Sequence, residues 1–433
     1  MLHNQNELFE PNKADATDNS VSFYLENGYA HRVLQVAGKK FEEKVKSYYN
    51  DYNSRDNFFV SALNSPIETI TEQNQSLNYI DLFCGGGGLS LGIHNAAKFL
   101  GFKPRALLAA DIDKVALNLV RSHFRPVYSR DKSVEDLIRY ELDLSNNNGR
   151  YITPPEIIDN QIKALRGRVD LLVGGPPCQG HSNLNNKTRR FDPRNLLYLT
   201  MPSFAIALNI PNIIIENVQT ITNAREKVVP ITRAILEANG YFVEEHVLKA
   251  SDFGVAQSRT RHFLIASKTQ DVRINSLVRA FSGDDISFNK ACLNMPKLDP
   301  SLSITESEST LSQENIERIN YLHDNDLNDL PNFVRPDCHK NGHTYVSVYG
   351  RIIGDLPMTT VTTGFASPGR GRFTHPTLRR PISIREAGRC QGFPDWYWTE
   401  AVKNQFSVTN YRKVIGDAVP SFFAYPLMAS LFT

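Results

Sequence analysis

The sequence predicts an α/β protein built on a Rossmann-type sheet, and two features between residues 77 and 111 support this most directly. A short apolar strand over residues 77–82 runs into four glycines at 85–88 and then into a helix over 89–100. A second strand, 106–110, ends at Asp111. A glycine-rich turn after a first strand is the point where such a sheet brings its backbone close to a ligand.

The rest of the sheet follows from alternating apolar strands and amphipathic helices. Helices are expected over 114–123 and 228–238, and a further helix is expected to end at Leu208. Asn239 and Gly240 end the helix 228–238. Alternation of this kind is typical of a largely parallel sheet covered by helices. The expected strands cover 140–144, 169–173, 211–215, 241–248 and 261–267.

Composition excludes several classes of protein. The 433 residues carry a net charge of only +2, so contact with nucleic acid would need a local basic patch. Five cysteines without a CxxC pair argue against a disulfide framework and a structural zinc site, and we expect no metal. We also expect no membrane span and no signal peptide, hence a cytoplasmic protein.

Changes in composition suggest four segments. Residues 1–76 would form a flexible tail and a helical extension, with two or three short helices between residues 21 and 62. Residues 77–268 would form the first part of a catalytic domain. Residues 269–380 would form a separate recognition region, since 269–342 are polar and poorly periodic. Residues 381–433 would complete the catalytic domain, starting with a capping box between Ser383 and Glu386.

The most distinctive stretch is 173–182, Val-Gly-Gly-Pro-Pro-Cys-Gln-Gly-His-Ser. Paired glycines relieve steric limits on the turn, and paired prolines fix φ and remove two backbone donors. A rigid loop is therefore expected at the carboxyl end of a strand, where open α/β sheets bind ligands. Cys178 in that loop is a candidate nucleophile, although a buried structural cysteine is the alternative.

Other polar residues are expected around the same crevice. Glu216 leaves the apolar strand 211–215 and would point toward Cys178 if the two strands are neighbours. Gln257, Arg259 and Arg261 alternate, so in an extended segment they share one face that suits a nucleotide or a phosphate. A solvated arginine pair is the alternative.

Acidic and basic residues elsewhere suggest ligand contacts. Asp111 is placed to take both hydroxyls of a ribose, and Asp143 could accept the exocyclic amine of an adenine, although each could instead be a helix cap or a solvated loop residue. The Gly/Arg-rich stretch 367–376 fits a surface laid along a phosphate backbone.

Four landmarks occur in one order: the glycine-rich turn, Pro-Pro-Cys-Gln, Glu-Asn-Val at 216–218 and Gln-x-Arg-x-Arg at 257–261. With Gly-Asp-Ala-Val-Pro at 416–420, the chain resembles the bacterial type of the DNA (cytosine-5)-methyltransferase family. The resemblance covers about 77–267 and 343–425. It implies a methyltransferase of the Rossmann-like type, with the variable target-recognition region between these parts.

The resemblance implies a catalytic mechanism. Cys178 would add to carbon 6 of cytosine, which makes carbon 5 nucleophilic enough to take a methyl group. Glu216 resembles the acid that bonds ring N3 and the exocyclic amine. Arg261 and Arg259 would hold the O2 edge and favour the thiolate.

The resemblance also implies that S-adenosyl-L-methionine is the methyl donor and S-adenosyl-L-homocysteine the product. Family members often have Asn where this chain has Asp417, and other residues are common at Gly180 and His181. By resemblance the donor would be bound by Phe83, Gly85, Gly87, Asp111, Ile112, Asp143, Leu144, Asp417 and Val419.

The expected substrate is a specific sequence in double-stranded DNA, with the target base flipped out of the helix. A cognate restriction endonuclease or components of a bacterial defence system are the expected partners, and we expect a monomer. The expected DNA contacts are Gln179, Ser182, Gln257, Thr362, Arg370 and Arg372.

Three other functions are weighed against this one. An RNA cytosine methyltransferase would share the site, but its typical Pro-Pro-Cys-Gln-Pro-Phe and Cys-Phe-Thr segments are absent. A dehydrogenase would explain the glycine turn and Asp111 but leaves Cys178 and Glu216 unexplained. A catalytically inactive DNA-binding regulator is disfavoured because Cys178 and Glu216 are intact.

Overall fold

A seven-stranded sheet forms the centre of the fold in the computed structural model, which describes residues 19–144, 149–177, 193–272, 274–307, 309–337 and 347–433. The strand order is β12-β13-β11-β10-β5-β6-β7, and β13 is the strand that runs antiparallel to its neighbours. This confirms the Rossmann-like sheet. Its strands are β5 (Gln75–Leu82), β6 (Phe102–Ala110), β7 (Tyr128–Arg130), β10 (Leu171–Gly174), β11 (Asn212–Val218), β12 (Phe242–Lys249) and β13 (Thr260–Ser267).

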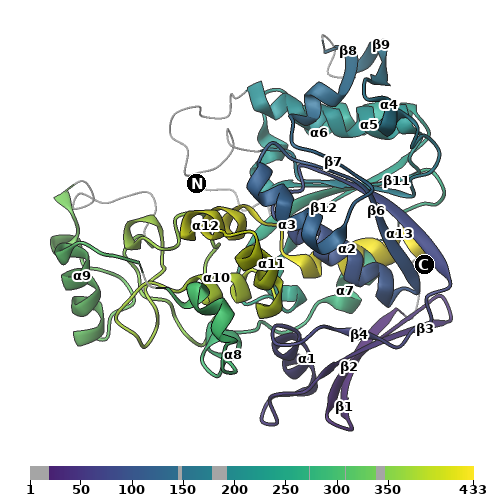
Figure 1. The fold of residues 1–433 in the computed structure, drawn as a ribbon. Helices are drawn as coiled ribbons and strands as arrows, with labels where there is room; N and C mark the ends of the chain where they lie inside the picture. The colour runs from purple at the N-terminus through teal and green to yellow at the C-terminus, as the bar shows by residue number, and fades with distance from the viewer. Residues whose placement is uncertain (1–18, 145–148, 178–192, 273, 308, 338–346) are drawn as a thin grey trace, which may run out of the picture.

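Helices cover both faces of this sheet (Figure 1). The side chains of β11 alternate between them: Ile213 and Ile215 join one hydrophobic cluster, and Ile214 joins the other. This period of two is expected for a strand that is buried on both sides. The helices around the sheet are α2 (Gly88–Phe99), α3 (Lys114–Phe124), α4 (Asn160–Lys163), α5 (Thr200–Leu208), α6 (Val228–Ala238) and α13 (Ala424–Phe432).

The strand expected over 140–144 exists, but it lies outside the central sheet. It is β8 (Ile138–Asp143), which pairs with β9 (Arg150–Ile157) in a separate two-stranded sheet. Asp143 therefore lies on a hairpin beside the sheet and does not end one of its strands.

The helices expected between residues 21 and 62 are largely wrong. This segment forms a meander of β1 (Ser20–Glu26), β2 (Tyr29–Val36) and β3 (Lys39–Lys46), joined at its edge by β4 (Glu68–Thr69), and only α1 (Ser54–Ala62) is helical. The turns explain the difference. Asn27-Gly28 and Ala37-Gly38 have positive φ at both residues, which is the geometry of a two-residue β-hairpin turn.

This N-terminal sheet packs against the C-terminal helix and belongs to the main hydrophobic core. The guanidinium of Arg32 on β2 is buried, bonds to Glu43 through Nε at 2.8 Å, and lies 3.8 Å from the ring centroid of Tyr425 on α13. A buried ion pair surrounded by aromatic rings thus joins the two ends of the chain.

The region expected to recognise the target lies beside the sheet and is irregular, on the left of Figure 1. Its described residues contain helices but no extended strand; Arg351 and Thr374 form only an isolated bridge. The helices there are α8 (Phe288–Cys292) and α9 (Gln313–Asp324), with short 3₁₀ turns between them. Helix α7 (Ile274–Phe281), expected in the same region, instead packs against α13 and β1 (Figure 1).

The C-terminal part returns to the catalytic sheet through α10 (Ile384–Cys390), α11 (Trp398–Lys403), α12 (Val408–Asp417) and α13. The predicted capping box between Ser383 and Glu386 is confirmed. Residues 408–432 have the length and apolar character of a membrane span, but 89% of the most apolar window is buried inside the fold. Burial of this kind is typical of a core helix.

Candidate active site

A small pocket lies at the carboxyl edge of the sheet, where the glycine turn after β5 meets the end of β11. Its volume is about 60 Å³. It brings together residues from four distant parts of the sequence. They are Asp81, Phe83, Cys84, Gly85, Gly86, Gly88 and Leu89 from the first turn, Gly175, Glu216, and Asp417, Ala418 and Val419 from the C-terminus.

The turn that precedes Cys178 is held against the end of β11. Asn217 donates a hydrogen bond from its side-chain amide to the Pro176 carbonyl at 3.1 Å. A Cβ on Gly175 would lie 3.0 Å from Oε2 of Glu216, so the glycine allows the backbone to pass beside the carboxyl group. Cys178, Gln179 and Ser182 lie outside the described residues.

Glu216 is buried and paired with a cation. Oε1 of Glu216 accepts from Nε of Arg261 at 2.8 Å, and the two side chains are 9% and 12% exposed. Burial raises the pKa of Glu216 above its ordinary value, while the positive charges of Arg261 and Arg259 oppose that shift. A carboxyl group with a raised pKa keeps its proton to higher pH and can therefore act as a general acid.

Asp81, which sequence reasoning passed over, also lines this pocket. Ser90 donates to its Oδ2 at 2.5 Å, whereas its buried Oδ1 has no hydrogen-bond partner. Burial raises the pKa of Asp81 to about 7, and the negative charge of Asp111 adds to that shift. Its position near the carboxyl end of the apolar strand β5 is the feature of the sequence that could have predicted a place in this pocket.

Asp111 is held by the backbone of the glycine turn. Its carboxylate accepts from the amides of Gly85, at 2.8 Å, and Asp113, at 2.7 Å. Burial nevertheless raises the pKa of Asp111. The adjacent Ile112 is 76% exposed, so an apolar side chain stands free beside the carboxylate. Asp143 and Leu144 are exposed as well.

The C-terminal segment closes the pocket because two glycines of α2 allow it to approach. A Cβ on Gly88 or on Gly92 would overlap the carbonyl oxygen of Val419 or of Ser421, respectively. Asp417 is exposed and pairs with Lys413 at 3.2 Å. Phe83 and Gly87 both have positive φ within the turn.

Two of the three alternating residues 257–261 hold the protein together. Gln257 is fully buried; its amide donates to the Cys390 carbonyl at 3.0 Å and accepts from the Val361 amide at 2.7 Å. The structure thus gives Gln257 a role inside the protein in place of a DNA contact. Arg259 is also buried and donates to the carbonyls of Val361 and Gly416.

The expected backbone-binding residues differ in their surroundings. Arg372 is engaged within the recognition region: it donates to the Asn328 carbonyl at 2.8 Å and to Asp329 at 2.6 Å. Arg370 is exposed and packs over Gly364, and Thr362 is partly exposed. Arg370 and Thr362 therefore remain available for a ligand, and Arg372 instead positions a loop.

Comparison with known proteins agrees with this geometry. The family model of C-5 cytosine-specific DNA methylases matches residues 77–432. The chain belongs to this family. It is 36% identical over 403 residues to the type II methyltransferase M1.BsuMI of Bacillus subtilis, covering 93% of this chain and 89% of that one. It is 28% identical to the type II methyltransferase M1.HphI of Haemophilus parahaemolyticus, covering 81% and 85%.

Solved structures show the same fold. The Dnmt2 methyltransferase of S. pombe superposes with a TM-score of 0.52 at 16% identity, over 82% of this chain and 98% of that one. The match to the family model and the similarity to M1.BsuMI show that the protein is a DNA cytosine-5 methyltransferase. In this methyltransferase the glycine turn, Gly175, Glu216 and residues 417–419 surround one pocket.

Proposed function

We propose that the methyltransferase modifies a specific sequence in duplex DNA through a covalent adduct between Cys178 and a flipped-out cytosine. The observation that carries the proposal is the buried Glu216 carboxyl, paired with Arg261 and touching the turn that leads to Cys178. Flipping is required because a duplex buries carbons 5 and 6 of the base by stacking.

The chemistry divides among three side chains. The Cys178 thiolate forms a C–S bond at carbon 6, and the electrons of the 5,6 double bond move to carbon 5. Glu216 gives its proton to N3, which neutralises the charge that develops on the ring. Arg261 holds Glu216 in position. After carbon 5 has gained the methyl group, with S-adenosyl-L-homocysteine as the other product, its proton is taken up by water and the thiolate is expelled. This restores the 5,6 double bond, and N3 returns its proton to Glu216.

We infer that the pocket beside the glycine turn takes S-adenosyl-L-methionine, which supplies an electrophilic methyl group when bound. The residues fit this group: the unpartnered Oδ1 of Asp81 is buried in the wall, and a cationic ligand would satisfy it. This pocket, of about 60 Å³, is too small for the whole molecule. Asp111 and the exposed Ile112 would bind the remainder, with Asp143 and Leu144 at the adenine end.

The cellular role we infer is modification within a restriction-modification system. The support is that the relatives compared above are named type II methyltransferases. Residues 269–380 would select the sequence, with Thr362 and Arg370 on the DNA backbone. Replacing 269–342 with the corresponding segment of a relative should change the sequence methylated, and an unaltered pattern would assign selection to another part.

The deciding experiment traps the adduct. A duplex carrying 5-fluorocytosine at the target position has no carbon-5 proton to lose, so the enzyme should remain bonded to it. A protein–DNA band that survives denaturation is expected for the wild type, only with the methyl donor present, and is expected to be absent for Cys178→Ser. Labelled methyl transfer to duplex DNA, with tRNA as the competing substrate, tests the substrate class. Transfer to tRNA alone would overturn the proposal.

A further inference from the structure

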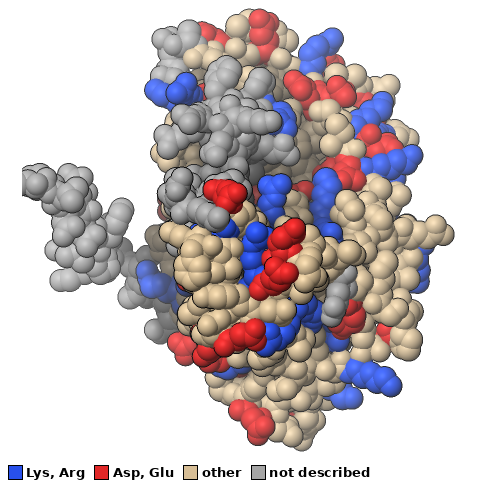
Figure 2. Space-filling view, turned by 90° about the vertical axis from the view of Figure 1, so that its left-hand side faces the viewer, with Lys and Arg blue, Asp and Glu red and all other residues tan. Residues whose placement is uncertain are grey.

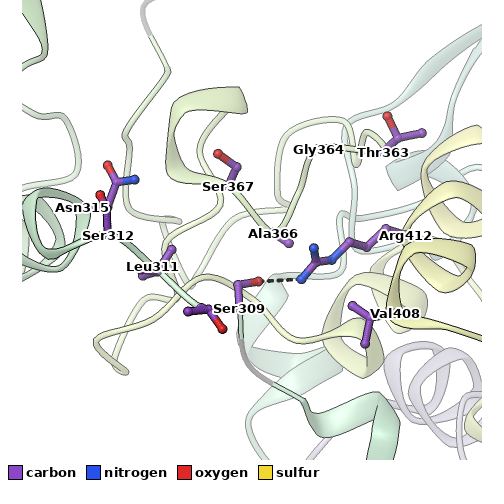
Figure 3. Close-up of a pocket in the computed structure, with 11 residues that line it drawn as sticks. Ser309, Leu311, Ser312, Asn315, Thr363, Gly364, Ala366, Ser367, Val408 and Arg412 are labelled. Carbon is purple, nitrogen blue, oxygen red and sulfur yellow. Dashed lines mark hydrogen bonds between the residues drawn. The ribbon is translucent and has the colours of Figure 1, made fainter.

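A second and larger cavity, distinct from the pocket described above, lies between the recognition region and α12. It has a volume of about 510 Å³ and opens to the surface (Figure 3). We call it the hydroxyl pocket, since most of its polar lining consists of hydroxyl groups. Its lining residues are Ser309, Thr310, Leu311, Ser312, Asn315, Thr363, Gly364, Ala366, Ser367, Val408 and Arg412.

Arg412 is the charged side chain of the hydroxyl pocket. It reaches across from α12 and donates from Nη2 to Oγ of Ser309 at 2.9 Å (Figure 3). Among the described residues the neighbouring Lys413, and not Arg412, forms the ion pairs with Asp113 and Asp417, and the buried Nε of Arg412 has no hydrogen-bond partner. Partial burial lowers the pKa of Arg412, as expected for a cation that has lost water without gaining a counter-ion.

The rest of the lining also suits an anion. No Asp or Glu is among the lining residues. Ser312 and Asn315 belong to the N-terminal cap and first turn of the 12-residue helix α9, the end that carries partial positive charge. Glu314 bonds to Ser312 from the same turn and is the acidic group that an anion would meet there. Several hydroxyl donors and one arginine are the groups that proteins commonly direct at phosphate oxygens.

The hydroxyl pocket adjoins the catalytic site through one shared turn. Gly416 packs against the backbone of Thr362 and Thr363, and Arg259 donates to the carbonyls of both Val361 and Gly416. The chain then continues directly into Asp417–Val419, which line the smaller pocket. A ligand that occupied the hydroxyl pocket would therefore be fixed relative to Glu216.

We propose that the hydroxyl pocket is a subsite for a phosphodiester group of the DNA backbone, held by Arg412 and the hydroxyls around it. The inference rests on the proposed function, that the substrate is duplex DNA. Arg412 would anchor the strand beside the flipped base, and Arg370, exposed over Gly364, would extend the track along the same strand.

The surface around this pocket is compatible with such a track. On the face that carries α9, which is the left side of Figure 1, Lys and Arg side chains gather around the middle with some acidic side chains beside them (Figure 2). Since the whole chain carries a net charge of only +2, local cations of this kind must supply the attraction for DNA.

The first experiment measures how many phosphate contacts the protein makes with DNA. Affinity for a duplex is measured against salt concentration for the wild type, Arg412→Gln and Arg412→Lys. Loss of one phosphate contact should lower the slope of log K against log salt by about 0.9, and lysine should preserve the slope. Arg166→Gln is the matched control. Arg166 is exposed and precedes β10, so it lies at the amino ends of the parallel strands, whereas the active site lies at their carboxyl ends. Equal slopes for the wild type and Arg412→Gln would overturn the proposal.

The second experiment locates the phosphate. Duplexes with one neutral methylphosphonate linkage are scanned across the target site. One linkage should weaken binding by the wild type but not by Arg412→Gln; equal losses at every linkage would overturn the proposal. If Arg412→Gln does not fold, Ser367→Asp serves instead, because Ser367 is exposed on the rim. Ser367→Asp should bind DNA at least tenfold more weakly than Ser367→Ala, and equal binding contradicts the subsite.

Methyl transfer by the wild type is measured in parallel, so the two proposals can fail separately. An enzyme that methylates duplex DNA while Arg412→Gln keeps the wild-type salt slope overturns only the subsite. An enzyme that binds duplex DNA through Arg412 but transfers no methyl group to it overturns the proposed function.

Discussion

The side chains of Glu216 and Arg261 form an ion pair, 2.8 Å from Oε1 to Nε, between two adjacent antiparallel strands of the sheet. Arg261 lies opposite Val218, two residues beyond Glu216 on β11. Because β13 runs antiparallel to β11, its first residues reach the edge at which β11 ends. The pair therefore depends on the reversed strand.

Replacing Glu216 with Gln should slow methyl transfer by roughly two to four orders of magnitude, since the acid that protonates N3 is lost. Arg261→Gln should slow transfer less, and the double variant should be little slower than Glu216→Gln if Arg261 acts by positioning Glu216. Single-turnover transfer of labelled methyl groups measures all three. Fully additive losses would contradict the positioning role.

The pH dependence of methyl transfer should show whether the protonated form of Glu216 is required. Its pKa is raised, so the protonated form persists to higher pH and transfer should decline as pH rises through that value. Deprotonation of Cys178 has the opposite effect, because the thiolate is the nucleophile and the rate rises with pH as it forms. The two effects together give a bell-shaped dependence of the rate on pH. In Glu216→Gln the descending limb should disappear. A descending limb that persists in this variant would assign it to another group.

Asp81→Asn should stabilise the free protein at alkaline pH. The ordinary pKa of 3.8 applies in the unfolded chain and about 7 in the folded one, so the folded state binds the extra proton and stability falls as pH rises through this interval. The full shift corresponds to about 4 kcal/mol at most. Asn can still accept from Ser90, so the fold should be kept.

Urea unfolding at pH 5 and pH 8 measures this effect, with Asp51→Asn on an exposed turn as the matched control. Titration calorimetry should show weaker binding of S-adenosyl-L-methionine to Asp81→Asn, since a buried carboxylate of the proposed donor pocket is gone. Unchanged donor affinity would place the donor elsewhere.

Local patterns predicted much of this fold. The glycines after β5, the box between Ser383 and Glu386 and the apolar strand before Glu216 depend on neighbours within a few residues, and all three are present, although β11 continues through Glu216 to Val218. The N-terminal hairpins have a local signal as well, the turn dipeptide Asn27-Gly28, but the apolar residues around it recur at a spacing that is typical of helices.

What the sequence could not disclose were contacts over long separations. Gln257 has its partners at Val361 and Cys390, more than 100 residues away, and Arg372 has its partners in an irregular loop. Alternation suggested that Gln257, Arg259 and Arg261 share one face of an extended segment, but β13 begins only at Thr260, and Gln257 forms just an isolated bridge to Met358. The role of Asp81 likewise depends on burial, which only the folded chain reveals.

Gly92→Ala should disturb the methyl-donor site from outside it. The added Cβ would overlap the backbone oxygen of Ser421, so the segment after Val419 must move. Overpacking of this kind costs roughly 1–3 kcal/mol of stability and should weaken donor binding as well. In Gly283→Ala, the matched control, the new Cβ meets only the Arg55 side chain, which can shift. Equal effects of the two variants would contradict the role of close packing at α2.

The N-terminal sheet should prove to be part of the cooperative core. Arg32→Met would leave Glu43 buried without its cation, and an uncompensated buried charge lowers the free energy of unfolding by about 3–5 kcal/mol. Burial already raises the pKa of Glu43, so the variant should regain part of this loss at acidic pH, where the carboxyl takes up a proton. The double variant Arg32→Met/Glu43→Leu should recover most of the stability, because it removes both charges and fills the same aromatic surroundings. Urea unfolding followed by fluorescence and by circular dichroism tests this: one transition that shifts with Arg32→Met is expected, whereas two separate transitions would make residues 20–69 an independent unit.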